Sequence, residues 1–100
     1  FMDRNKLRNV SEMPKPRGEN GEKNLVGSRL KALREEHHYS QRDLASILQT
    51  IGMDMDKNVI TRIETNKRYV TDIEIKALAE IFHVTYKYLI DGIIETEEKG

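Results

Sequence analysis

The sequence predicts an all-α fold, a compact domain of five short helices. Apolar side chains recur at spacings of three and four residues, which places them on one face of a helix. Four segments follow a residue that commonly caps a helix N-terminus, namely Ser40, Asp56, Thr71 and Thr85. No stretch alternates apolar and polar residues as a half-exposed strand does, and no internal repeat is present. The helices are therefore expected to share one hydrophobic core.

The first helix is expected from Asn24 to about His37, because Val26, Leu30 and Leu33 fall on one face. The second is expected from Ser40, which has an acidic residue three positions later, to about Gly52. Its apolar face consists of Leu44, Ile47, Leu48 and Ile51.

The third helix is expected to begin after the capping residue Asp56. Helical spacing turns Val59, Ile60 and Ile63 toward the core. Four polar side chains are left facing outward or sideways: Lys57, Asn58, Thr61 and Arg62.

The last two helices also carry start and stop signals. Thr71 and Glu74 have the spacing of a capping box, and the helix that follows is expected to end near His83. Thr85 can cap a final short helix that Gly92 would terminate. The apolar residues of the two helices are Ala77, Leu78, Ile81, Phe82, Tyr86, Tyr88, Leu89 and Ile90.

Composition divides the chain into three parts. Residues 1–22 hold both prolines and little apolar surface, so a mobile basic arm is expected there. Met13 is a candidate initiator, which leaves residues 1–12 as a candidate non-native extension. Residues 23–92 are expected to fold, and residues 93–100 to form an acidic tail.

Length and composition exclude several classes of protein. One hundred residues suffice for one small core. Cysteine is absent, which excludes disulfides and thiolate metal sites, and no run of about 18 apolar residues is present to cross a membrane. A cytoplasmic protein is therefore expected. The net charge is zero, but residues 71–100 hold seven acidic and three basic side chains, so residues 1–70 are net basic.

Enzyme activity is not expected from this sequence. It has no cysteine nucleophile, no glycine-rich phosphate loop and no evident pair of catalytic carboxylates. His37, His38 and His83 lack the spacing of metal ligands, so no metal or other cofactor is expected.

The region from about Asn24 to Gly92 resembles the phage repressor and Cro type of helix-turn-helix, the XRE-like transcription regulators. The resemblance depends on the spacing of several short motifs: Arg29-Leu30, Leu33-Arg34, Ser40-Gln41, Leu44-Ala45, Ile60-Thr61-Arg62-Ile63-Glu64, Lys67-Arg68, Leu78-Ala79, Val84-Thr85 and Leu89.

The resemblance implies a sequence-specific DNA-binding regulator, most often a repressor that occupies promoter DNA. It assigns base reading in the major groove to the outward residues of the third helix, Lys57, Asn58, Thr61 and Arg62. It assigns DNA phosphate contacts to the start of the second helix and to the segment after the third, that is to Gln41, Arg42, Thr65, Asn66, Lys67 and Arg68. It also implies a partly buried structural ion pair between Arg34 and Glu64.

Some of these assignments have an alternative. Arg62 could hold a phosphate in place of a base, and Lys67 and Arg68 could interact with the carbonyl end of the third helix. His38 and Asn66 stand where the family favours glycine, and both residue types tolerate a positive φ. The span from Leu48 to Ile60 is about five residues longer than usual, which indicates either a longer second helix or a longer loop holding Met53 and Met55.

The expected partner is double-stranded DNA, bound by a homodimer. Tyr86, Tyr88, Ile90, Ile93 and Ile94 supply more apolar surface than one short helix needs, which suits a self-complementary patch. The neutral total charge, the long connection and the acidic tail favour an alternative. In that alternative the same scaffold is a protein-interaction module, such as an antitoxin or a co-regulator that binds a protein partner.

Overall fold

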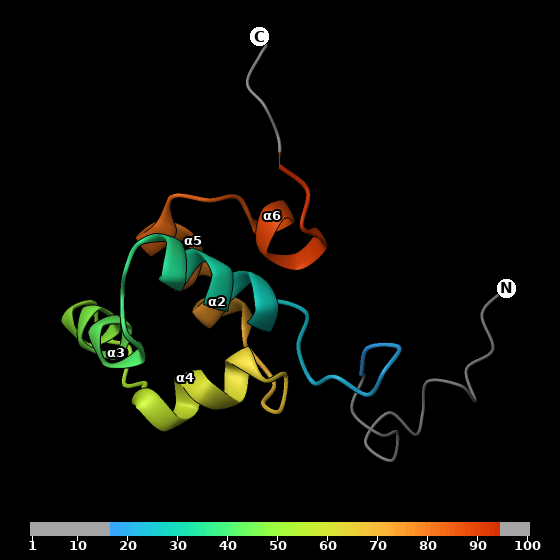
Figure 1. The fold of residues 1–100 in the computed structure, drawn as a ribbon, viewed down its shortest axis with the longest axis horizontal. Helices are drawn as coiled ribbons and strands as arrows, with labels where there is room; N and C mark the ends of the chain where they lie inside the picture. Colours follow the sequence, from blue (N-terminus) through green and yellow to red (C-terminus); the bar gives the residue numbers. More distant parts are fainter. Residues whose placement is uncertain (1–16, 95–100) are drawn as a thin grey trace, which may run out of the picture.

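The helices of the computed structural model lie close to the segments that the sequence predicts (Figure 1). The structure describes residues 17–94, and no strand is present in that range. Most of the expected arm and the last six residues of the expected tail lie outside it. The helices are α2 (Gly27–Glu36), α3 (Gln41–Thr50), α4 (Lys57–Glu64), α5 (Asp72–Phe82) and α6 (Tyr86–Asp91).

The predicted N-terminal caps all form. Ser40 and Asp43 make a capping box, in which each side chain accepts the other's backbone N–H at 3.0 and 2.8 Å. Thr71 and Glu74 make a second one at the start of α5. Asp56 accepts the N–H of Val59 at 2.9 Å, and Thr85 caps α6 in the same way. These caps satisfy donors that have no partner within the helix.

The first helix begins three residues later than predicted. It starts at Gly27, and the N–H of Gly27 donates to the side-chain oxygen of Asn24 at 2.9 Å. Val26 is the N-cap residue of α2 and makes no side-chain cap, so Asn24 lies before the helix and binds its first residue.

Three helices end in the same type of turn. The residue after each C-cap has a positive φ, and its N–H and the next N–H bond back to carbonyls of the last helical turn, as in a Schellman motif. These residues are His38 (φ 61°), Gly52 (φ 84°) and Asn66 (φ 62°). The positive φ expected at His38 and Asn66 is thus present. His83, at the end of α5, also has a positive φ, 55°, which the sequence did not predict.

The long connection between α3 and α4 is a loop. Gly52 ends α3 near the predicted position, and the N–H of Met53 donates to the carbonyl of Leu48 at 2.9 Å. Met55 is buried in the core, and Met53 packs against the core from the loop. The two methionines therefore anchor the extra residues to the domain.

The core lies among all five helices. Its fully buried side chains are Val26, Leu30, Leu44, Leu48, Ile60, Ile63, Leu78 and Leu89. Helix α2 contacts α4 on one side and α6 on the other, and α3 packs beside α4 (Figure 1). This packing leaves one long face of α4 at the surface of the domain.

Candidate nucleic-acid interface

Helix α4 has a buried face and an exposed face. Ile60 and Ile63 are completely buried and attach the helix to the core. Lys57, Asn58 and Arg62 are exposed on the other face. Thr61 is only half-exposed and lies at the border between the two faces, beside α3. Of the four residues assigned to base reading, the structure therefore brings three together on open surface.

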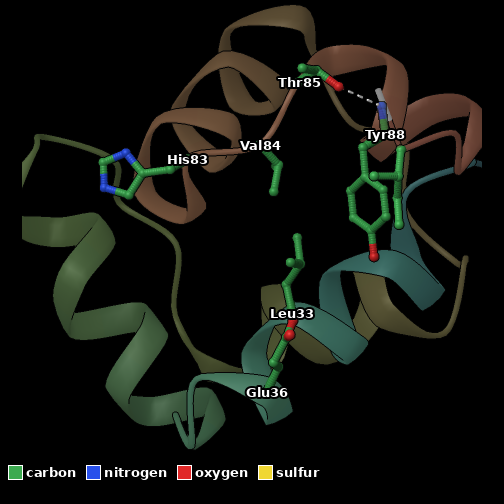
Figure 2. A pocket seen from close by; sticks show the side chains of 7 residues that line it. Leu33, Glu36, His83, Val84, Thr85 and Tyr88 are labelled. Atoms are coloured by element: carbon green, nitrogen blue, oxygen red, sulfur yellow. Dashed lines mark hydrogen bonds between the residues drawn. The ribbon is translucent and has the colours of Figure 1, made fainter. Parts of the chain in front are cut away.

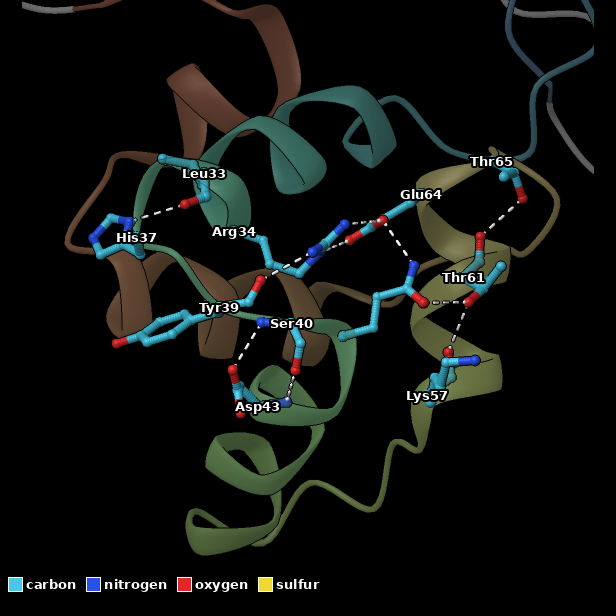
Figure 3. Close-up of polar contacts among 11 residues, drawn as sticks. Leu33, Arg34, His37, Tyr39, Ser40, Asp43, Lys57, Thr61, Glu64 and Thr65 are labelled. Carbon is cyan, nitrogen blue, oxygen red and sulfur yellow. Dashed lines mark hydrogen bonds and ion pairs between the residues drawn. The ribbon is translucent and has the colours of Figure 1, made fainter.

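A buried ion pair joins α2 to α4 (Figure 3). Arg34 Nε and Nη2 donate to the two carboxylate oxygens of Glu64 at 2.6 and 3.0 Å. The third nitrogen, Nη1, donates to the carbonyl of Tyr39 at 2.9 Å. The hydrogen bonds to Glu64 raise the pKa of Arg34 above its ordinary value, although burial opposes this. Glu64 faces the interior, so it takes no part in the exposed surface.

Gln41 extends this pair to Thr61 on α4. Its Nε2 donates to Glu64 at 3.1 Å, and its Oε1 accepts from the hydroxyl of Thr61 at 2.9 Å. The Thr61 hydroxyl also lies 3.0 Å from the carbonyl of Lys57. Gln41 and Thr61, which were assigned to phosphate and base, thus use their polar atoms to connect α3 with α4.

Asn66 also turns toward the protein. Its Nδ2 donates to the backbone and side-chain oxygens of Asn24 at 3.1 and 3.0 Å. The buried amide of Asn24 in turn donates to the carbonyls of Ile63 and Arg68. The two asparagines join the end of α4 to the start of α2. Asn24 is not among the residues that the sequence singled out, although asparagine often binds backbone groups close to a helix start.

Gly27 allows α2 and α4 to approach closely. A Cβ at this position would lie 2.3 Å from the carbonyl oxygen of Ile63 and 2.8 Å from the amide nitrogen of Asn66. Both atoms belong to the turn that ends α4. A side chain at position 27 would therefore separate the two helices.

Arg68 forms a second ion pair with a glutamate. Its two terminal nitrogens donate to the carboxylate oxygens of Glu74 at 3.0 and 3.1 Å, and Nη1 also donates to the carbonyl of Tyr69. The hydrogen bonds raise the pKa of Arg68. Burial acts to raise the pKa of Glu74, but bonds from Arg68 and Thr71 outweigh it, and that pKa lies below its ordinary value. The guanidinium assigned to phosphate is thus held against α5.

The other residues assigned to phosphate contacts remain at the surface. Arg42 lies in the first turn of α3, and Thr65 and Lys67 follow α4; all three are exposed. The Thr65 hydroxyl donates to the carbonyl of Thr61 at 2.9 Å, as Figure 3 shows. The surface around α4 therefore presents four exposed cations: Arg42, Lys57, Arg62 and Lys67.

A hollow of about 440 Å³ lies on the other side of the domain, between α2 and the turn from α5 to α6 (Figure 2). Its polar residues are Glu36, His83 and Thr85, and the Thr85 hydroxyl already accepts the N–H of Tyr88 at 3.0 Å.

The described residues 17–94 contain no cluster of three potential metal ligands. In the same range no helix has the length and apolar character needed to cross a membrane.

The profile of the helix-turn-helix family HTH_3 matches residues 30–89, from the middle of α2 to the middle of α6. The matched segment contains α3, the loop and α4 in the arrangement described above. The chain belongs to this XRE-type helix-turn-helix family. No curated protein and no solved structure gives a significant match.

Membership settles the general class of the protein. HTH_3 is a family of DNA-binding transcription regulators and not a family of enzymes. The described residues 17–94 accordingly form a helical, DNA-binding regulatory domain with a helix-turn-helix made by α3 and α4.

Proposed function

We propose that this helix-turn-helix domain is a sequence-specific repressor, which occupies promoter DNA by placing α4 in the major groove. The observation that carries the proposal is the exposed polar face of α4, with Asn58 and Arg62 at the surface and Ile60 and Ile63 fixed in the core. A helix held in this way can enter the groove while its other face stays attached to the domain.

Asn58 and Arg62 are the proposed base-reading residues with the greatest discriminating power. Asparagine can make paired hydrogen bonds to adenine and arginine to guanine, each pair typically worth about 1–3 kcal/mol of discrimination. Lys57, in the first turn of α4, can reach either a base or a phosphate. Thr61 reads a base through its methyl group, since its hydroxyl is bound to Gln41.

The proposed phosphate contacts are made by the exposed residues around α4. Arg42 in the first turn of α3, and Thr65 and Lys67 after the end of α4, supply two exposed cations and a hydroxyl. The side chains of Gln41 and Asn66 are already hydrogen-bonded within the protein. Only their remaining amide N–H groups are left to donate to DNA phosphates. Arg68 positions the turn after α4 through Glu74.

The neutral total charge and the pairing of Arg68 favour a second candidate function, a protein-interaction module such as an antitoxin or co-regulator. Salt dependence separates the two functions. Phosphate contacts release counterions, so log affinity falls linearly with log salt concentration, whereas affinity at an apolar protein interface depends weakly on salt.

The test is selection of binding sites from a random duplex pool, followed by titration of the selected and a scrambled duplex at two salt concentrations. A palindromic site bound at least about a thousandfold more tightly than the scramble is the expected result. Absence of enrichment, with weak binding that ignores sequence, would reject the repressor and favour the protein-interaction module.

A further inference from the structure

A chain of hydrogen bonds runs from the buried ion pair to Thr61, at the border of the exposed face of α4. Glu64 Oε1 accepts from Arg34 Nη2 at 3.0 Å and from Gln41 Nε2 at 3.1 Å. Gln41 Oε1 in turn accepts from the Thr61 hydroxyl at 2.9 Å. The helices α2, α3 and α4 thus contribute to one network, which ends on a half-exposed side chain.

The ion pair determines which way the Gln41 amide faces. A carboxylate has no proton to donate, so Glu64 can only accept, and the NH₂ end of the amide must face it. The carbonyl end must then face Thr61, and an amide oxygen can only accept a hydrogen bond. The Thr61 hydroxyl is therefore the donor in its bond to Gln41.

The Thr61 hydroxyl has no proton left for DNA. It carries a single proton, and the carbonyl of Lys57, 3.0 Å away, is a second acceptor for it (Figure 3). Both acceptors belong to the protein, one on α3 and the other one helical turn earlier on α4. Contacts on two sides of the oxygen also hold this β-branched side chain in one χ1 rotamer. Of the two groups on the Cβ of Thr61, the methyl is the one available to a molecule bound at α4.

We propose that Gln41 is a positioning residue, which fixes Thr61 so that its methyl group recognises the C5-methyl group of a pyrimidine in the major groove. Thymine carries this group there, and cytosine lacks it. 5-Methylcytosine carries it at the same ring atom, so methylation of a cytosine strengthens binding at this position. The inference rests on the proposed function, because it concerns the DNA site that α4 reads.

Duplexes that differ by one methyl group test the role of Thr61. Each thymine in one half of the selected site is replaced in turn by uracil, which removes only the C5-methyl group. The wild type is expected to lose about fourfold in affinity at one position, the effect of removing one buried methyl-sized group. Thr61→Ser keeps the hydroxyl and removes the methyl group, so it is expected to bind the thymine and uracil duplexes equally there.

Thr65→Ser is the matched control for Thr61→Ser. It makes the same change at an exposed threonine that follows α4 and whose hydroxyl also bonds to a carbonyl one helical turn earlier. This variant is expected to keep the preference of the wild type for thymine over uracil.

The same position of the site tests recognition of 5-methylcytosine. A C·G pair replaces the T·A pair in one duplex, and a 5-methylcytosine·G pair replaces it in another, so these two duplexes differ by one methyl group. The wild type is expected to bind the methylated duplex about fourfold more tightly than the unmethylated one. Thr61→Ser is expected to bind both equally.

Gln41→Met tests the positioning role. Methionine has a similar length but lacks the N–H groups and the oxygen of the amide, so Thr61 keeps only its bond to Lys57. The preference of this variant for thymine over uracil is expected to fall toward that of Thr61→Ser. A ratio of two affinities measured on one preparation does not depend on the folded fraction, so a loss of stability cannot imitate this result.

Three results would overturn the proposal. The first is a wild type that loses no more affinity than Thr61→Ser at any thymine replaced by uracil. The second is a wild type that gains nothing from cytosine methylation. The third is a Gln41→Met variant that keeps the thymine preference and binds all duplexes more weakly by one factor, as expected of a lost phosphate contact. Failure of the proposed function gives a different result, because no site would then be enriched in the selection.

Discussion

Two ion pairs of the same chemistry differ in burial and in what surrounds them. Arg34 and Glu64 have side chains that are 11% and 3% exposed and join α2 to α4 in the interior. Arg68 and Glu74 are 31% and 11% exposed and join the turn after α4 to the start of α5. An arginine close in sequence or space to α4 can therefore serve the fold, since both of these guanidiniums are held by glutamates. The exposed cations around α4 are the ones proposed to contact phosphates.

The buried pair should show the larger effect when one partner is removed. Glu64→Gln is expected to destabilise the fold by about 3–5 kcal/mol, because the Arg34 guanidinium is left buried without its counter-charge. The measurement is urea unfolding of Glu64→Gln, Arg34→Met and the double variant. Additive losses, with no coupling between positions 34 and 64, would show that the pair is not the connection that the geometry indicates.

The close approach of α2 and α4 that accompanies the buried pair depends on Gly27. Gly27→Ala is expected to cost about 1–3 kcal/mol, because the new methyl group would overlap the Ile63 carbonyl and the helices would have to separate. Thermal unfolding measures the loss. Gly21→Ala reports backbone strain without overlap, because φ at position 21 is 83° and nothing lies within 4 Å of the new methyl group. If Gly27→Ala unfolds at the same temperature as the wild type, the start of α2 and the end of α4 lie farther apart than the structure shows.

The more exposed pair should contribute less. Removal of Glu74 or Arg68 is expected to cost on the order of 1 kcal/mol, since solvent screens the partly exposed guanidinium. A double-mutant cycle with Glu74→Gln and Arg68→Met, followed by urea unfolding, measures the coupling. A coupling free energy as large as that between Arg34 and Glu64 would contradict the expectation that the more buried pair contributes more to stability.

Glu74 should also give the second pair a dependence on pH. Its pKa in the folded protein lies below the ordinary value of 4.5, so its contribution to stability is complete above that value and is lost as the pH falls through the lower folded pKa. The stability difference between the wild type and Glu74→Gln is therefore expected to shrink as the pH falls below the ordinary value of 4.5 and through the lower folded pKa. A difference that stays constant over this range would show that the pair does not hold Glu74 ionised.

The helices were predictable because their signals are local. Ser40, Asp56, Thr71 and Thr85 cap helices through bonds to residues three positions away, and periodic apolar residues identify the buried faces. The start of α2 was placed three residues too early, because apolar spacing alone does not show that Asn24 lies before the helix.

The polar contacts between segments distant in sequence were harder to predict. The pair of Arg34 with Glu64 was suggested by the family resemblance. The resemblance assigns Arg68 to a DNA phosphate, and the sequence alone does not show that Glu74, six residues away, comes within hydrogen-bonding distance of it. Likewise, the bond between Gln41 and Thr61 depends on how α3 and α4 pack. The assignment of individual residues to bases or phosphates remains a prediction.

We propose that the exposed face of α4 reads bases, while the paired residues around it hold the helix. The most direct measurement is the affinity of Asn58→Ala for the selected site and for each single-base variant of it, alongside the wild type. The account predicts that Asn58→Ala loses about 1–3 kcal/mol of discrimination at one position of each half-site and keeps the preferences at the others. Uniform weakening across all the duplexes, or a profile identical to that of the wild type, would contradict it.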